Sequence, residues 1–116
     1  AEQALFKKNF VFVHIKATDS LAEDGKYCEK MSFIERIDQE MRELNHPDDT
    51  LIVITCDHST CCLQKRHCDR PCPVLIWGSG QDSTGAFSEK ECARGELGKF
   101  SQLDLMKKVI DLSNDN

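Results

Sequence analysis

The sequence predicts an α/β fold containing part of a mostly parallel sheet flanked by helices, with the sheet incomplete in this chain. The residue patterns along the chain predict a strand, a helix, two further strands and a second helix, in that order. Each strand segment is apolar on both faces, which requires more neighbouring strands than 116 residues supply. We therefore expect the missing strands to come from further sequence, another chain or an oligomer. An isolated chain with such an unpaired sheet edge is expected to self-associate or to be poorly soluble.

The first half of the chain predicts one strand and one helix. Residues 10–15 (FVFVHI) are aromatic and β-branched, which predicts a buried strand, and the polar residues 16–25 predict a loop. Apolar side chains then recur at steps of three and four residues and form one face of a helix: Tyr27, Met31, Ile34, Ile37, Met41 and Leu44. Residues 45–49 end this helix, because Pro47 cannot donate the helical hydrogen bond.

The second half predicts two strands separated by a long loop. Residues 50–55 and 73–78 are the strand segments, and the cysteine-rich residues 56–72 form the loop. Residues 79–98 contain four glycines and predict an irregular surface segment.

A helix closes the chain. Ser101 and Asp104 have the spacing of a capping box, and the apolar residues that follow predict an amphipathic helix. We find no internal repeat and no linker, so residues 1–116 are expected to form a single segment.

Metal-capable side chains follow the second strand directly. Asp57 and His58 come after the apolar run 51–54, and His67 lies nine residues further along. The carboxyl edge of an open α/β sheet is where such folds bind ligands and perform chemistry. The pattern therefore predicts a site at this edge that contains carboxylate and imidazole groups.

Composition narrows the class of protein. A net charge of −5 and a pI near 5.3 argue against nucleic-acid binding, which normally requires a basic face. No apolar run approaches the roughly 18 residues of a membrane span. Seven cysteines, an odd number without a signal peptide, favour a reducing, cytoplasmic compartment and mostly free thiols.

Several motifs occur in a fixed order: residues 12–19 (FVHIKATD), Asp24-Gly25, residues 55–60 (TCDHST), His67 and residues 69–74 (DRPCPV). Residues 87–89, 95–98 and 105–106 continue the series. Together they resemble the archaeal-type cofactor-independent phosphoglycerate mutases of the alkaline phosphatase superfamily. The resemblance covers nearly the whole chain but only the C-terminal part of a family member.

The resemblance implies an alkaline-phosphatase-like sheet with two divalent metal ions (Mn, Zn, Mg or Co) at its end. It implies that Asp57 and His58 ligate one ion and that Asp19 and His67 ligate the other. Carboxylates suit hard cations and imidazole suits Mn or Zn. The activity implied is a glycolytic isomerisation of 3-phosphoglycerate and 2-phosphoglycerate by metal-assisted phosphoryl transfer through a serine.

Two basic side chains match the family pattern as candidate catalytic residues. Lys16 and Lys30 would neutralise substrate charge, with an ordinary surface charge as the alternative for each. Glu23 occupies a position where the family usually has histidine. It is a further candidate ligand, although a solvated loop acid is the preferred interpretation.

The resemblance also implies that this chain lacks the serine nucleophile. We therefore expect a C-terminal fragment of a catalytic domain that is inactive alone. Its partners would be phosphoglycerate and either the missing N-terminal half of the enzyme or an oligomer partner.

The candidate ligands have simpler structural alternatives. Asp57 could cap a turn, Asp19 could begin one, and His67 could be an exposed loop histidine. The ligand interpretation is preferred for all three.

Two other functions remain open. The first is a non-catalytic module that holds structural zinc through thiols and imidazoles, which requires four ligands. The candidates are Cys56, His58, Cys61, Cys62, His67, Cys68 and Cys72, whose spacing matches no zinc-finger template. The second is a metal-dependent phosphatase or phosphonate enzyme of the same superfamily, because fold and metal site do not fix the substrate.

Overall fold

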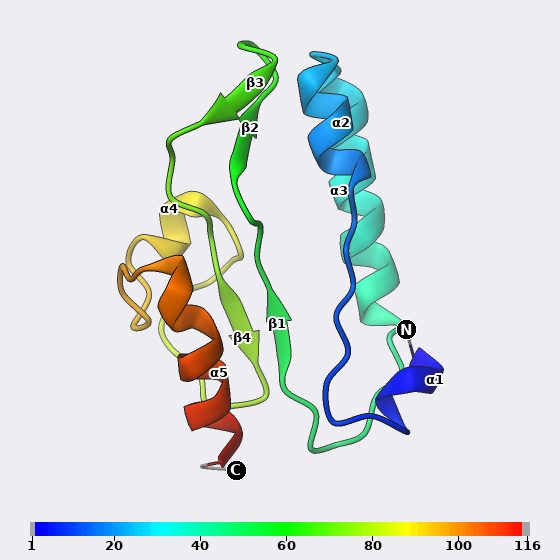
Figure 1. The fold of residues 1–116 in the computed structure, drawn as a ribbon, viewed down its shortest axis with the longest axis vertical. Helices are drawn as coiled ribbons and strands as arrows, with labels where there is room; N and C mark the ends of the chain where they lie inside the picture. The colour runs from blue at the N-terminus through cyan, green and yellow to red at the C-terminus, as the bar shows by residue number, and fades with distance from the viewer. Residues whose placement is uncertain (1, 115–116) are drawn as a thin grey trace. The chain divides into compact units, whose positions relative to one another are not determined.

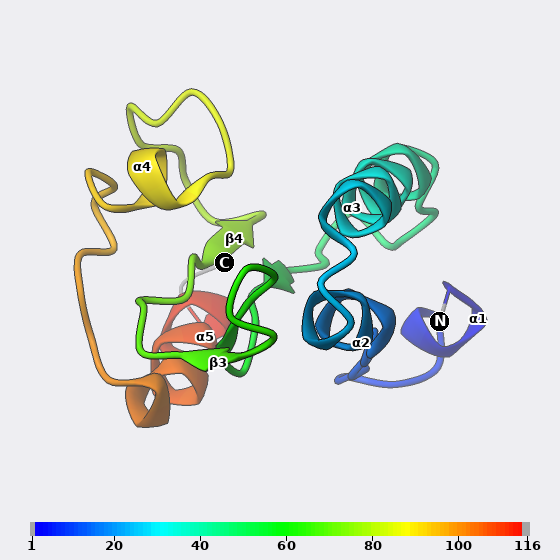
Figure 2. The same cartoon turned by 90° about the horizontal axis from the view of Figure 1, so that it is seen from above.

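The computed structural model describes residues 2–114 and is shown from two directions in Figures 1 and 2. The chain divides into two compact units, each assembled from two stretches of sequence. Within the described part, the first unit contains residues 2–48 and 58–69. The second unit contains residues 49–57 and 70–114.

Two packed helices form most of the first unit. The short helix α1 (Glu2–Leu5) is followed by α2 (Ala17–Glu23) and the long helix α3 (Tyr27–Arg42), and α2 lies against α3 (Figure 1). The chain reverses between them at Gly25, which has a φ of +76°. The Gly25 amide donates to the Ala22 carbonyl at 2.9 Å, and the Lys26 amide donates to the Leu21 carbonyl at 2.8 Å. These two bonds are a Schellman motif, which satisfies the last carbonyls of α2.

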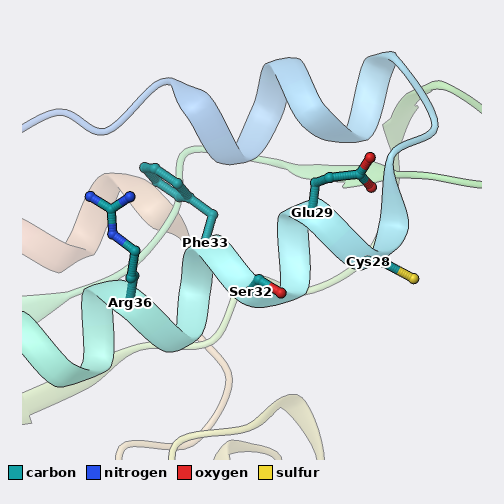
Figure 3. A pocket seen from close by; sticks show the side chains of 5 residues that line it. All are labelled: Cys28, Glu29, Ser32, Phe33 and Arg36. Atoms are coloured by element: carbon teal, nitrogen blue, oxygen red, sulfur yellow. The ribbon is translucent and has the colours of Figure 1, made fainter.

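The predicted amphipathic helix is confirmed as α3, and it ends before the predicted stop at residues 45–49. Part of its apolar face stays exposed, since Met31 is 45% and Ile34 is 48% accessible. Figure 3 shows the side chains that line a surface pocket, all of which come from α3: Cys28, Glu29, Ser32, Phe33 and Arg36.

A β-hairpin completes the first unit. Strands β2 (Ser59–Cys61) and β3 (Arg66–Cys68) pair in antiparallel register, with Thr60 opposite His67. In the turn, the amides of Gln64 and Lys65 both donate to the Cys61 carbonyl, and Lys65 adopts a left-handed φ of 53°. The hairpin contacts α2, and Lys30 Nζ on α3 donates to the Thr60 carbonyl at 3.1 Å.

A second strand pair defines the second unit. Strands β1 (Ile52–Ile54) and β4 (Leu75–Trp77) are antiparallel, with Val53 opposite Ile76. Beyond the ladder, Thr55 Oγ1 donates to the Pro73 carbonyl at 3.2 Å. Both strands were predicted from their apolar sequence.

Three short helical elements follow these strands. Helix α4 (Glu89–Cys92) is capped by Ser88, whose hydroxyl accepts from the Glu91 amide. The 3₁₀ turn η1 (Gln102–Asp104) leads into α5 (Leu105–Asn114). The predicted capping role of Ser101 is confirmed, because its hydroxyl accepts from the Leu103 amide at 3.3 Å.

Several predictions from sequence were wrong. Residues 10–15 form no strand, and residues 17–23 of the expected loop are helical. The expected loop 56–72 contains the hairpin β2–β3. Both strand pairs among the described residues are antiparallel, in place of the expected parallel pairing. A strand exists only where a partner accepts its backbone hydrogen bonds, and residues 10–15 have no such partner within residues 2–114.

The described residues bury little apolar surface. Among residues 2–114, Ala22 is the only hydrophobic residue that is buried, whereas Phe12 is 76% exposed. An aromatic residue exposed to this extent within an apolar run is typical of a surface that another chain segment covers. The described helices include none that is both long and apolar enough to cross a membrane. All seven cysteines are free thiols, as predicted.

Candidate metal centre

Three metal-capable side chains converge in the first unit. One donor atom each from Asp19, His58 and His67 lies within 4.8 Å of the other two. Asp19 comes from α2, His58 immediately precedes β2, and His67 lies in β3. The cluster therefore joins a helix to both strands of a hairpin.

The hairpin explains why the two histidines meet. Alternate residues of a strand point to the same face, so His58 lies on the same side as Thr60. Thr60 pairs directly with His67 across the ladder. The imidazole rings of His58 and His67 consequently stack, with centroids 3.7 Å apart and planes inclined by 29°.

Asp19 supplies the negative charge of the cluster. Its side chain is 13% exposed, and it accepts bonds from Lys16 Nζ and, at 2.5 Å, from Thr60 Oγ1. The bond from Lys16, followed by the bond from Thr60, lowers the pKa of the Asp19 carboxyl from 3.8 to about 2. Asp19 is therefore ionised near neutral pH, which is the protonation state that a metal ligand requires.

A second acid lies beside His67. His67 Nε2 is 3.7 Å from Asp19 Oδ1 and 3.8 Å from Glu23 Oε1. Because Glu23 follows Asp19 by four residues on α2, the two carboxylates share one face of that helix. Glu23 thus lies on a helix, where a loop was expected, and its side chain is 48% exposed, as expected of a solvated acid.

The donor set fits a divalent cation. Ligands on one zinc ion, at bond lengths of about 2.1 Å, can be at most about 4.2 Å apart. The 4.8 Å limit on the three donor atoms is close to this spacing, so the three groups are near enough to ligate one ion or two adjacent ions. One carboxylate with two imidazoles suits zinc or manganese better than magnesium or calcium, which prefer oxygen ligands.

Comparison with known proteins identifies the family. A protein-family model described as the metalloenzyme superfamily matches residues 2–112. This chain belongs to the metalloenzyme superfamily. The predicted kinship with cofactor-independent phosphoglycerate mutases is confirmed, because the chain matches the C-terminal quarter of these enzymes at about 40% identity.

Three relatives illustrate the extent of the match. The 2,3-bisphosphoglycerate-independent phosphoglycerate mutase of Methanoculleus marisnigri is 42% identical over 112 residues, which cover 95% of this chain and 27% of that enzyme. The same enzyme of Pyrobaculum aerophilum is 38% identical over 109 residues, covering 91% and 26%. The solved structure of the PH0037 protein from Pyrococcus horikoshii has a TM-score of 0.92 and 37% identity.

These coverages define what part of the superfamily fold is present. The match to the Pyrococcus structure covers 100% of this chain and 32% of the solved chain. The chain spans about a quarter of the length of the curated relatives that it matches. It is therefore a fragment of the alkaline-phosphatase-like metalloenzyme fold.

The other predicted site residues occupy different surroundings. Asp57 is not a member of the three-residue group and belongs to the second unit, where its carbonyl accepts from Gln102 Nε2 at 3.2 Å. Lys16 pairs with Asp19, and Lys30 supports the hairpin through its bond to the Thr60 carbonyl.

Sequence reasoning missed Thr60. Its hydroxyl contacts two of the three candidate ligands, Asp19 and His58. The alternation His58-x-Thr60 was the available signal, but it becomes informative only if residues 59–61 are known to form a strand.

The thiols do not form a comparable cluster. The candidate metal group found among residues 2–114 contains no cysteine. Burial, and then the hydrogen bond with Cys72, raise the pKa of the Cys56 thiol to about 12. Because zinc binds the thiolate, this environment disfavours Cys56 as a metal ligand.

Proposed function

We propose that this chain is the C-terminal, metal-binding part of the catalytic domain of a 2,3-bisphosphoglycerate-independent phosphoglycerate mutase. The convergence of Asp19, His58 and His67 in a chain of the metalloenzyme superfamily carries the proposal. The proposed reaction interconverts 3-phosphoglycerate and 2-phosphoglycerate. Relatives at about 40% identity bear the name of that enzyme, which supports this choice of substrate.

Each candidate ligand has a proposed place. Asp57 and His58 would hold one divalent ion, and Asp19 and His67 would hold the other. The position of His58 within 4.8 Å of both members of the second pair supports two adjacent ions. Ions held by these residues would supply positive charge to stabilise the attacking and leaving oxygens of an in-line phosphoryl transfer.

The remaining polar residues adjust the charge of the site. Glu23 would be an additional ligand beside His67, and its carboxylate makes the centre more negative than a histidine would. Lys16, whose side chain is 61% exposed, is close enough to Asp19 to place its ammonium group beside a substrate phosphate. Lys30 is proposed to contribute positive charge from the α3 side.

The rest of the enzyme would supply what this chain does not. The proposal assigns the serine nucleophile and the missing strands of a mostly parallel sheet to additional sequence or a partner chain. Exposed apolar residues, such as Phe10 at 62% and Phe12 at 76%, support such a covering partner. A glycolytic enzyme of this kind would work in the cytoplasm.

Metal titration of the complete 116-residue chain under reducing conditions tests the metal site. We expect Mn²⁺ or Zn²⁺ binding, measured by isothermal titration calorimetry, to weaken at least tenfold in Asp19→Asn and in His67→Ala. The matched control is Asp38→Asn, which removes a carboxylate from an exposed ion pair on α3 and should leave the affinity unchanged.

A double variant, Cys61→Ser with Cys62→Ser, separates this proposal from a thiol-held zinc site. Retained binding in the double variant supports the carboxylate–imidazole centre. Binding that is lost with the thiols and unaffected by Asp19→Asn would refute it.

A chimaeric enzyme tests the substrate. This chain would replace the matching C-terminal quarter of the Methanoculleus mutase, and 2-phosphoglycerate formation would be measured alongside release of inorganic phosphate. Isomerisation without phosphate release supports the mutase. Phosphate release alone from a folded chimaera would instead favour a phosphatase of the same superfamily.

A further inference from the structure

Thr60 lies between two of the candidate ligands and contacts both with one hydroxyl. Its Oγ1 is 2.5 Å from Asp19 Oδ1 and 3.2 Å from His58 Nδ1. A threonine hydroxyl has a single proton to donate, with lone pairs to accept. The two contacts therefore require different roles for the hydroxyl.

The distances assign these roles. An ionised carboxylate only accepts, and a hydroxyl bonded to one is typically 2.5–2.7 Å away. The contact with Asp19 has this length, so the Thr60 proton points toward Asp19. The 3.2 Å contact with His58 then has the ring nitrogen as donor and the hydroxyl oxygen as acceptor. This places the ring proton of neutral His58 on Nδ1.

The tautomer decides which nitrogen can bind a cation. With its proton on Nδ1, neutral imidazole carries its lone pair on Nε2, and the bond made by one ring nitrogen selects the other for metal ligation. We infer that Thr60 is a positioning residue that holds His58 in the Nδ1–H tautomer and thereby presents Nε2 to a divalent ion. The inference rests on the proposed metal-binding function and extends it to a residue outside the ligand set.

The backbone around Thr60 keeps its hydroxyl in place. Thr60 is the central residue of β2, is paired with His67, and its carbonyl accepts from Lys30 Nζ at 3.1 Å. The strand register thus fixes the hydroxyl between α2 and the His58 ring. A hydroxyl on a mobile loop would select the tautomer less strictly, because movement of the loop backbone would break the bond.

Two variants of Thr60 separate the hydroxyl from the shape of the side chain. Thr60→Val keeps the β-branched shape that suits a strand, and Thr60→Ser keeps the hydroxyl. Thr55→Val is the matched control, because it removes a hydroxyl that bonds to the Pro73 carbonyl in the second unit. Far-UV circular dichroism would establish that each full-length variant retains the parent's secondary structure.

The first measurement is the His58 tautomer, observed by ¹⁵N NMR of the metal-free chain at pH 8.5, where histidine is ordinarily neutral. We expect Nδ1–H in the parent, in Thr60→Ser and in Thr55→Val, and a shift toward Nε2–H in Thr60→Val. A parent chain with Nε2–H, or an unchanged tautomer in folded Thr60→Val, would overturn the inference.

The second measurement is Zn²⁺ affinity. Loss of an outer-shell partner typically weakens metal binding about 10- to 100-fold. We expect a loss of that size in Thr60→Val, recovery in Thr60→Ser and no change in Thr55→Val. Equal affinity in parent and Thr60→Val would overturn the positioning role. Failure of the metal site itself would appear separately, as zinc binding that ignores Asp19→Asn and His67→Ala, and the NMR result would still decide whether Thr60 sets the tautomer.

Discussion

Replacing Lys16 with methionine should raise the pKa of Asp19 and remove part of the stability of the first unit. The methionine keeps most of the apolar stem of the lysine but lacks the ammonium group that bonds to the Asp19 carboxylate. That bond is the largest cause of the lowered pKa of Asp19, ahead of the bond from Thr60. We therefore expect the pKa of Asp19 to move from about 2 toward its ordinary value of 3.8.

The size of the effect follows from linkage between protonation and folding. A pKa lowered from 3.8 to about 2 corresponds to roughly 2.4 kcal/mol of folding free energy at 1.36 kcal/mol per pH unit. The Lys16 side chain is 61% exposed, so water and salt screen its charge and we expect about 1–2 kcal/mol. Because the pKa is lower in the folded state, this stability is present above pH 3.8 and is lost as the pH falls toward 2.

Carboxyl ¹³C NMR titration of the metal-free chain measures the pKa directly. The matched control is Lys26→Met, which removes an ammonium group paired with Asp24 at 3.1 Å, where both side chains are more than half exposed. This control should leave the Asp19 titration unchanged. A parent Asp19 that titrates near 3.8, or an Asp19 that still titrates near 2 in Lys16→Met, would refute the reasoning.

Three further predictions concern the ligand set, the backbone and the exposed apolar surface. Glu23→His should tighten Zn²⁺ binding about tenfold in calorimetry, because an imidazole replaces a carboxylate 3.8 Å from His67; weaker binding would exclude position 23 from the site. Gly78→Ala should destabilise the second unit by about 2–4 kcal/mol in urea denaturation, since Gly78 has a φ of +106° and its Cβ would lie 2.8 Å from the Thr50 carbonyl oxygen. Gly85→Ala, which meets nothing within 4 Å, is its control, and equal stability of the two variants would contradict the prediction. The double variant Phe10→Asp, Phe12→Asp should reduce self-association in sedimentation, whereas a parent chain that is already a monodisperse monomer would show that the exposed aromatics do not drive association.

Local sequence determined the elements whose information is contained within a few residues. The periodicity from Tyr27 to Met41 predicted α3, and Ser101 marked the start of the closing helical segment. The apolar runs containing β1 and β4 were also predicted. In each case the side chains of the segment itself carry the preference.

Elements that depend on distant partners were predicted poorly. Residues 10–15 have strand composition but no strand partner among residues 2–114. A strand forms only where another segment pairs with its backbone, and the composition of the segment does not reveal that partner. Helix α2 has a polar sequence without apolar periodicity, and it is stabilised by its Schellman motif at Gly25 and by packing against α3. The hairpin turn contains no glycine that would have signalled it in the sequence, and Lys65 adopts the left-handed conformation instead.

The chain by itself determined which residue types are available for metal binding, and its ordered motifs indicated the family. Only the tertiary structure decided that Asp19 meets His58 and His67, which lie 39 and 48 positions further along the chain. It also decided that Thr60 lies between a carboxylate and an imidazole. The physical reason is that a ligand's chemistry belongs to its side chain, whereas the distance between ligands is set by strand register and helix packing, which are interactions between segments remote in sequence.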